Sequence, residues 1–296
     1  MFSQIPKHSK ADFPFLKRLP SRYGLFPSVG SSDEVWVLGK ETSPSAAFCL
    51  FYREWESGLL HEKRWGLKWA ASRSDKDLAQ AVSQLPALFR KKGAASVAVR
   101  AFMADHAFIQ MLERNGFHYV GGLVTLRIPP EGLKREGPVS KDEIPLRPAE
   151  KKDLGPLKVI AREAFREGRF YHEPGLKKGA AQIIYGEWAK NMLNYADEVR
   201  VAGKKPLGFV SLKKDVSNKR IWIDLIAVSP TAQSKGIGAL LAAESRKAAL
   251  RQKGWDLGVK TEPENLGALR FYLKNGFALE SFQLDYIWRK KPGKSI

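Results

Sequence analysis

Apolar residues in the second half of the chain are spaced first as in a strand and then as in a helix. The run 221–228 is almost continuously apolar and predicts a buried strand. From Ile237 the apolar positions follow helical spacing up to Gly254, a residue that can end a helix in the left-handed conformation. Residues 255–261 predict a second strand, and 266–274 predict a helix that stops at Asn-Gly. The order of these elements is strand, loop, helix, strand and helix.

Two glycines stand where the predicted strand turns into the predicted helix, in the segment 233–238, which reads Q-S-K-G-I-G. Glycine lets backbone N–H groups approach a phosphate closely, and the N-terminus of a helix attracts negative charge. The segment therefore predicts a binding loop for a phosphorylated cofactor. It has neither the G-x-x-x-x-G-K-S/T pattern of a Walker A loop nor the third glycine of the Rossmann fingerprint.

A second motif follows this loop. Residues 265–277 read N-L-G-A-L-R-F-Y-L-K-N-G-F. This segment resembles the N-x-x-A-x-x-x-Y-x-x-x-G-F segment of the GNAT superfamily of N-acetyltransferases, and 233–238 resembles the coenzyme A loop of that superfamily, Q/R-x-x-G-x-G/A. The resemblance implies the GNAT fold, which is an α+β fold with a mixed sheet, together with an acetyltransferase activity and acetyl-coenzyme A as the cosubstrate.

The first half of the chain contains a second copy of part of this pattern. Residues 91–100 and 111–117 mirror 252–260 and 271–277, with an offset of 161 residues at the first glycine and 160 at the second. Each copy has a helix, a Lys-Gly stop, a strand, another helix and Asn-Gly-Phe. A repeat of this kind predicts two related structural units.

The first copy lacks the residues that mark the second as a cofactor site. Leu112 stands at the position of Tyr272, and Asp105 stands at that of Asn265. The pattern Q-x-x-G-x-G does not occur before residue 130. The first half is therefore predicted to bind no coenzyme A and to supply no catalytic hydroxyl.

A stretch rich in proline, glycine and charged residues separates the two copies. Residues 129–143 begin P-P-E-G-L-K-R-E-G-P, a composition typical of a linker. We predict a truncated, non-catalytic GNAT-like domain at 1–128 and a complete catalytic GNAT domain at 144–296.

The composition restricts the class of protein further. The chain has 296 residues, of which 44% are hydrophobic, and no apolar run approaches the length of about 20 residues that a membrane span needs. The N-terminus has no signal-peptide core, so we expect a cytoplasmic protein. The one cysteine, Cys49, excludes an internal disulfide and any multi-cysteine zinc site, and we expect no metal.

The net charge of +19 has two interpretations. Lys and Arg are spread along the chain as singles and pairs, without an arginine-rich tract or an RNA-binding motif, so nucleic acid is a disfavoured partner. The charge is either a solvated basic surface or a field that concentrates the phosphates of coenzyme A and of a nucleotide-linked acceptor.

A narrower resemblance covers most of the chain. The segments Trp55-Glu56-Ser57, 168–174 and 184–191 resemble parts of the dTDP-fucosamine acetyltransferase group of GNAT enzymes. Those enzymes acetylate the amine of a nucleotide-linked amino sugar. The motif departs from the group at Glu56, which replaces an aspartate, and at 58–60, where an aromatic pair is missing.

The GNAT resemblance assigns roles to individual residues. Tyr272 would be the general acid that protonates the departing thiolate, and a core aromatic is the structural alternative. Asn265 would hydrogen-bond the cofactor, with a helix cap as the alternative. The backbone of 225–228 would polarise the thioester. The predicted cofactor-binding residues are Ile226, Ala227, Val228, Gln233, Ser234, Lys235, Gly236, Ile237, Gly238, Asn265 and Phe271.

Removal of a proton from the amine needs a base, for which the sequence offers several groups. Asp224 and Glu262 are the candidate bases, and a strand-end or solvated carboxylate is the alternative for each. The candidate acceptor-binding residues lie in the aromatic segment 165–188, which could instead simply pack on the sheet. They are Tyr171, His172, Glu187 and Trp188.

Three functions fit these motifs. The first is an N-acetyltransferase acting on a primary amine of a small molecule, with a nucleotide-linked amino sugar as the favoured acceptor. The second is acetylation of a protein, a peptide or an amino acid. The third is a non-catalytic acetyl-coenzyme A sensor or a basic nucleic-acid-binding module, which the retained loop and Tyr272 disfavour. A homodimer is left open.

Overall fold

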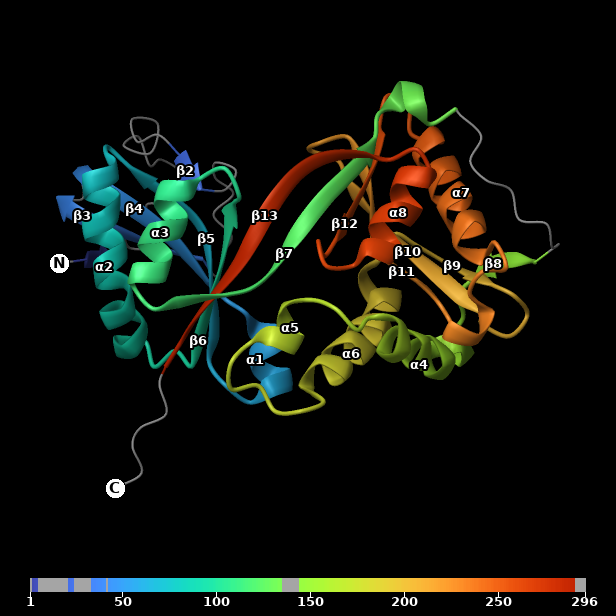
Figure 1. Ribbon diagram of the computed structural model, residues 1–296, viewed down its shortest axis with the longest axis horizontal. Coiled ribbons are helices and arrows are strands. Elements are labelled where there is room, and N and C mark those ends of the chain that lie inside the picture. Colours follow the sequence, from blue (N-terminus) through green and yellow to red (C-terminus); the bar gives the residue numbers. More distant parts are fainter. Residues whose placement is uncertain (1, 5–20, 24–32, 41, 135–143, 291–296) are drawn as a thin grey trace. The chain divides into compact units, whose positions relative to one another are not determined.

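A computed structural model describes residues 2–4, 21–23, 33–40, 42–134 and 144–290 of the chain. These residues form two compact units. Unit 1 comprises Met1–Gly121, His172–Pro174 and Gln283–Ile296, and unit 2 comprises Gly122–Tyr171 and Gly175–Phe282. Each unit is a sheet with helices packed on it (Figure 1).

Unit 1 has a sheet in the order β1-β3-β4-β5-β6-β13, and β2 also pairs with β5. Helices α2 and α3 pack on one face of this sheet, where Phe89 and Phe108 are fully buried. Ser74 caps α2 by accepting a hydrogen bond from the backbone N–H of Asp77. The elements are β1 (Phe2–Gln4), β2 (Ser21–Tyr23), β3 (Glu34–Lys40), β4 (Ser43–Tyr52), α1 (Glu54–Leu60), β5 (Arg64–Ser72), α2 (Asp75–Lys91), β6 (Ser96–Phe102) and α3 (His106–Arg114).

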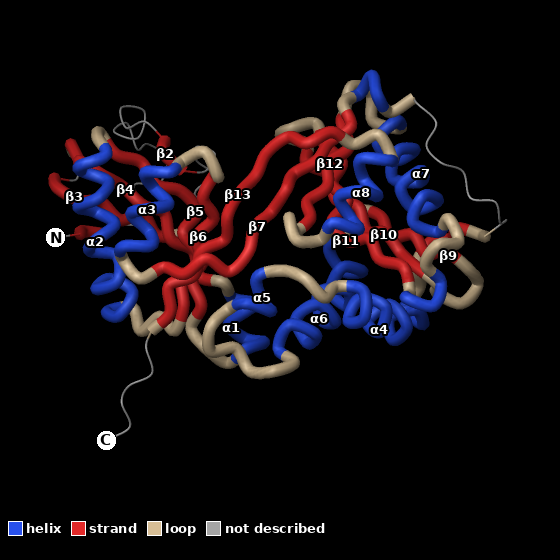
Figure 2. The backbone as a smooth tube through the Cα atoms, viewed as in Figure 1, coloured by secondary structure: helices blue, strands red, loops and turns tan. Residues whose placement is uncertain are grey.

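Unit 2 has a sheet in the order β7-β12-β11-β10-β9-β8, with helices on both faces (Figure 2). Helices α7 and α8 cover one face around Leu241 and Tyr272, and α4 and α6 cover the other around Leu157 and Met192. The elements are β8 (Leu146–Pro148), α4 (Leu154–Ala164), α5 (Arg169–His172), α6 (Ala180–Tyr195), β9 (Glu198–Ala202), β10 (Gly208–Asp215), β11 (Arg220–Val228), α7 (Ile237–Leu250), β12 (Asp256–Thr261) and α8 (Leu266–Lys274).

The repeat found in the sequence is present in the fold. Apart from α1, which lies between β4 and β5, the series β3-β4-β5-α2-β6-α3 has the same order and pairing as β9-β10-β11-α7-β12-α8. Asp105 caps α3 and Asn265 caps α8 in the same way, each accepting a hydrogen bond from a backbone N–H three residues later. The mixed α+β fold with two GNAT-like halves is therefore confirmed.

The two longest strands do not follow the linear division of the chain at 128 and 144. Strand β7 (Phe117–Ile128) begins in unit 1, but residues 124–128 pair with β12 of unit 2. Strand β13 (Ala278–Arg289) begins in unit 2, and residues 283–289 pair with β6 of unit 1. Each unit thus completes its sheet with a strand that starts in the other. Of the predicted linker, residues 135–143 lie outside the described part of the chain.

Candidate active site

The parallel strands β11 and β12 of unit 2 separate halfway along their length. Their pairing runs from Arg220↔Asp256 to Ile223↔Val259 and ends there. Strand β11 continues to pair with β10 on its other side as far as Val228↔Gly208. The edge of β11 after Ile223 therefore carries backbone groups outside the β12 ladder.

A β-bulge at Asp224 accompanies this separation. In β10, Ser211 opposes Leu225 and Leu212 opposes Ile223, so Asp224 is the extra residue. The Leu225 N–H donates to Ser211 Oγ at 3.1 Å. Ile223 packs with the α7 and α8 side of the sheet, whereas Leu225 packs with α4 and α6. Because a bulge puts two consecutive residues on one face, Asp224 lies on the α6 side of the sheet.

The loop between β11 and α7 has the features of an anion-binding turn. Ser234 has φ 64° and Gly236 has φ 78°, both in the left-handed region. Gly236 occupies the N-cap position of α7 and provides no side-chain cap. The first N–H groups of α7 can therefore donate to a bound phosphate, and residues 233–235 are exposed beside them. This geometry fits the pyrophosphate of coenzyme A.

Three predicted cofactor residues have structural roles as well. Asn265 Oδ1 accepts a hydrogen bond from the Ala268 N–H at 3.0 Å, so the helix-cap alternative is present. A β carbon at Gly238 would lie 3.1 Å from the ring of Phe271. Gly238 and Phe271 thus set the close packing of α7 on α8.

Tyr272 is buried in unit 2, on α8. Its ring lies 5.2 Å from that of Phe271 and 5.3 Å from that of Phe277. Burial, together with the neighbouring carboxylate of Glu262, raises the pKa of Tyr272 above its ordinary value. The hydroxyl is therefore protonated at neutral pH and can donate a hydrogen bond or a proton.

Glu262 lies between two tyrosines. A β carbon at Gly168 would be 2.6 Å from the Tyr185 hydroxyl and 2.7 Å from Glu262 Oε1, so these three residues converge. Burial, and then the charge of Glu262, raises the pKa of Tyr185. Glu262 also acts on Tyr272. The charge of Glu262 therefore raises the pKa of a tyrosine on α6 and of another on α8.

Helix α6 and the chain before it form an aromatic stack. Tyr185 is stacked on Phe165 at 5.1 Å and on Trp188 at 6.2 Å, and Tyr171 is stacked on Tyr185 at 6.2 Å. The Tyr171 hydroxyl donates to the Phe165 carbonyl at 2.6 Å. Much of the aromatic surface predicted for the acceptor thus packs against itself.

Tyr195 is a site residue that the sequence analysis missed. The Trp188 indole N–H donates to the Tyr195 hydroxyl at 2.6 Å, and that hydroxyl donates to Asp224 Oδ2 at 2.7 Å. Residues three and seven positions apart lie on one face of a helix. The spacing of Tyr185, Trp188 and Tyr195 on α6 is the signal that could have revealed it.

The sequence of this domain matches one family. The model of the Acetyltransferase (GNAT) family matches residues 164–277. The chain carries a GNAT acetyltransferase domain. The match spans the aromatic helix, the separated strands, the anion-binding loop and α8, so residues 164–277 form an acetyltransferase domain of the GNAT type.

Curated relatives of the GNAT protein include two bacterial proteins. The spore coat polysaccharide biosynthesis protein SpsD of Bacillus subtilis strain 168 is 26% identical over 243 residues, covering 81% of this chain and 83% of its own. A dTDP-fucosamine acetyltransferase of Escherichia coli O6:H1 is 27% identical over 178 residues, covering 58% of this chain and 72% of its own.

Solved structures share the fold across almost the whole chain. A tandem GNAT protein from the clavulanic acid biosynthesis pathway has a TM-score of 0.63 at 10% identity and covers 99% of both chains. A GCN5-related N-acetyltransferase from Sphaerobacter thermophilus has a TM-score of 0.61 at 13% identity, covering 92% of this chain and 84% of that one. These structures support the assignment of two GNAT-like halves.

In unit 1, the strand edge and the helix start that correspond to the cofactor site of unit 2 are occupied by residues of unit 1 itself. Strands β5 and β6 also separate, after Leu67↔Val99, but β2 pairs with β5 at Ala70 and Ala71 beyond that point. The connection from β5 to α2 consists of residues 73 and 74, and Ser74 caps the helix. That the first half binds no cofactor stays a prediction.

Two other predicted acceptor residues have different surroundings. The Glu187 carboxylate is ion-paired with Lys158 and, at 3.3 Å, with Lys190. The hydrogen bond from Lys158 is the main cause that lowers the pKa of Glu187. His172 is exposed at the end of α5 and belongs to unit 1. The Glu187 carboxylate is thus engaged by two lysines.

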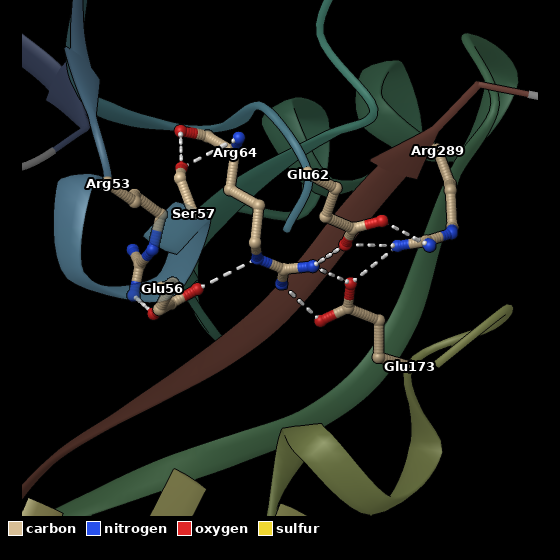
Figure 3. Close-up of polar contacts among 7 residues, drawn as sticks. All are labelled: Arg53, Glu56, Ser57, Glu62, Arg64, Glu173 and Arg289. Carbon is tan, nitrogen blue, oxygen red and sulfur yellow. Dashed lines mark hydrogen bonds and ion pairs between the residues drawn. The ribbon is translucent and has the colours of Figure 1, made fainter. Parts of the chain in front are cut away.

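The Trp-Glu-Ser motif belongs to a buried ion network in unit 1 (Figure 3). Glu56 accepts hydrogen bonds from Arg53 and Arg64, and Ser57 Oγ accepts one from the Arg64 N–H at 3.0 Å. The network continues to Glu173, Glu62 and Arg289. The motif thus stabilises unit 1 through three arginines and three glutamates.

The described residues contain no cluster of three or more His, Cys, Asp or Glu side chains that could hold a metal ion. In the same part of the chain, every helix is too short or too polar to cross a membrane.

Proposed function

We propose that the protein transfers the acetyl group of acetyl-coenzyme A to a primary amine of a small molecule, and that a nucleotide-linked amino sugar is the favoured acceptor. The observation that carries the proposal is the opening between β11 and β12, which lies next to the uncapped start of α7. Tyr272, Glu262 and Asp224 are the protonatable groups of this region. We place the reaction in the cytoplasm.

The cofactor would bind along the loop and the free edge of β11. The backbone N–H groups of 236–238 would hold its pyrophosphate, and the exposed residues 233–235 would border it. The backbone of 225–228 would hydrogen-bond the pantetheine arm and polarise the thioester carbonyl. A thioester supplies an acyl carbon that an uncharged amine can attack.

The reaction removes two protons from the ammonium group of the acceptor. An ammonium group loses both of them as it becomes an amide N–H, while the C–N bond forms and the C–S bond breaks. One proton ends on the sulfur of coenzyme A, and the other leaves for solvent. Tyr272 would donate the first, because a phenol, whose ordinary pKa is about 10, is protonated at neutral pH and can transfer its proton to the forming thiolate.

The choice of acceptor rests on the relatives. One is named a dTDP-fucosamine acetyltransferase, and the other is named for spore coat polysaccharide biosynthesis. Both names concern carbohydrate. The basic charge of +19 would favour an acceptor that carries phosphate groups.

An acceptor screen tests this proposal. The purified protein is incubated with acetyl-coenzyme A and with dTDP-fucosamine, free amino acids or peptides, and the released thiol is measured. We expect turnover with dTDP-fucosamine, and a rise in melting temperature with coenzyme A alone. Turnover with peptides or amino acids, and none with dTDP-fucosamine, would show that the acceptor is a peptide or an amino acid. Stabilisation by nucleic acid, without any by coenzyme A, would overturn the proposed function.

A further inference from the structure

Unlike several carboxylates of unit 2, Asp224 has an uncharged partner. Asp153, Glu187, Asp256 and Glu280 each form an ion pair with an arginine or a lysine. Asp224 instead accepts a hydrogen bond from the uncharged hydroxyl of Tyr195, at 2.7 Å. Within the described residues no Lys or Arg pairs with it. In a chain with a net charge of +19, such a carboxylate can still receive a cation.

Asp224 lies at the point where β11 and β12 separate. It directly follows Ile223, the last residue of β11 that pairs with β12. It is also the extra residue of the bulge, which places it on the α6 side of the sheet. The carboxylate is half-buried, so an ionic contact with it is screened less than one on the open surface.

The hydrogen bonds around Asp224 fix its orientation. The Tyr195 hydroxyl occupies Oδ2, and it accepts in turn from the Trp188 indole N–H at 2.6 Å. Lys213 Nζ lies 4.8 Å from the centre of the Tyr195 ring. Oδ2 is engaged by a neutral donor, and within the described part of the chain no hydrogen bond reaches Oδ1.

We propose that Asp224 receives the ammonium group of the acceptor and takes its first proton, and that Tyr195 is the positioning residue that fixes the carboxylate for this role. The inference rests on the proposed function, because it concerns the same opening. The ligand chemistry is a primary aliphatic amine, which is a cation at neutral pH. The N–H bond breaks, its electron pair stays on nitrogen for attack on the acyl carbon, and the proton forms an O–H bond on Asp224.

The first test is a double-mutant cycle on acetyl transfer to dTDP-fucosamine. We expect Asp224→Asn to lower kcat/KM for the amine by about 100-fold, within the usual range for a proton acceptor. Tyr195→Phe should lower it by about tenfold while the KM for acetyl-coenzyme A stays unchanged. The double variant should be no slower than Asp224→Asn, since Tyr195 acts through Asp224.

The matched control is Tyr52→Phe, because Tyr52 is exposed to 37% and Tyr195 to 38%. Tyr52→Phe should keep wild-type kinetics. The inference is overturned if Asp224→Asn retains wild-type kcat/KM, or if Tyr195→Phe costs a further tenfold in the Asp224→Asn background. A Tyr195→Phe protein that no longer binds coenzyme A would also contradict the assigned role, because the effect would then be general.

A binding measurement separates this inference from the proposed function. The indole N–H resonance of Trp188, assigned by its loss in Trp188→Phe, reports on the hydrogen bond to Tyr195. We expect dTDP-fucosamine to shift it in the wild type but not in Asp224→Asn, and the analogue with a hydroxyl in place of the amine to leave it unchanged. A wild type that neither turns over nor binds dTDP-fucosamine contradicts the proposed acceptor. Turnover that is insensitive to Asp224 contradicts this inference alone.

Discussion

Glu173 places both carboxylate oxygens on the guanidinium of Arg64, at 2.7 and 2.6 Å, although the two residues are 109 positions apart in the sequence. The Arg64 side chain is 1% exposed and that of Glu173 is fully buried. Arg289 of β13 completes the arrangement by donating to Glu173 at 3.1 Å (Figure 3). Unit 1 is therefore held together by charges from three distant parts of the chain.

Replacing Glu173 should destabilise the protein strongly. Glu173→Gln keeps the size of the side chain but leaves part of the Arg64 and Arg289 charge buried without compensation, which costs about 3 kcal/mol. Urea unfolding would measure the difference. Glu163→Gln, at an exposed position of α4, is the matched control and should change the free energy of unfolding by less than about 0.5 kcal/mol. Equal effects of the two variants would show that the network adds no stability.

Removing the hydroxyl of Tyr272 should separate chemistry from binding. Tyr272→Phe retains the ring that packs between Phe271 and Phe277, so the fold should be kept. We expect turnover to fall by at least about tenfold, because the thiolate loses its proton donor, while the dissociation constant of coenzyme A stays nearly the same. Steady-state kinetics and calorimetry check the two quantities. Unchanged turnover, or an equal loss of binding, would contradict the role of general acid.

A side chain at Gly168 should disturb the arrangement of Tyr185 and Glu262. Gly168 has φ 111°, and a β carbon there would meet the Tyr185 hydroxyl and Glu262 Oε1 below 3 Å. Gly168→Ala should therefore lower both the melting temperature and the turnover. Gly179→Ala isolates the backbone strain, since Gly179 has φ 88° and open space around its β-carbon position. If the two variants have the same turnover, contact with the carboxylate has no effect on catalysis.

One molecule of coenzyme A should bind per chain. Unit 1 pairs β2 with the free edge of β5 and caps α2 with Ser74, whereas the corresponding groups of unit 2 remain available. Isothermal titration should give a stoichiometry of one. A stoichiometry of two would contradict the non-catalytic first half.

The loop of unit 2 should account for this binding. Gly236→Ala should weaken it by about tenfold, because a left-handed residue other than glycine costs about 1–2 kcal/mol. Gly254→Ala, at φ 77° with no atom near its β-carbon position, is the control for strain at the other end of α7. An equal loss of affinity in both variants would show that the loop does not bind coenzyme A.

The local elements and the anion-binding loop could be predicted from the sequence, because each depends on residues within a few turns of chain. Glycine at 236 and the apolar spacing after it are sufficient to indicate a loop before a helix. The repeat also predicted two related units. The sequence pattern, however, does not show which strands pair with each other. It therefore did not predict that β7 pairs with β12 of unit 2 and that β13 pairs with β6 of unit 1, which we call the strand exchange.

The candidate site was predicted only in part for a similar reason. Asp224 was one of the candidate bases in the sequence, but its partner Tyr195 is 29 positions away on another element. Likewise, nothing near Glu173 in the sequence indicates that it is buried against Arg64. Such contacts arise from tertiary packing, which single-sequence periodicity does not encode.

The strand exchange also determines the order in which the protein can fold during synthesis. Domains usually fold from the N-terminus as they leave the ribosome. Unit 1 pairs β6 with residues 283–289, however, so its sheet cannot be complete when residue 121 has been made. At about 5–20 residues per second, the missing strand arrives roughly 10–30 s later. During this interval β6 has an open edge, and a nascent chain stalled or cleaved before residue 283 would keep it.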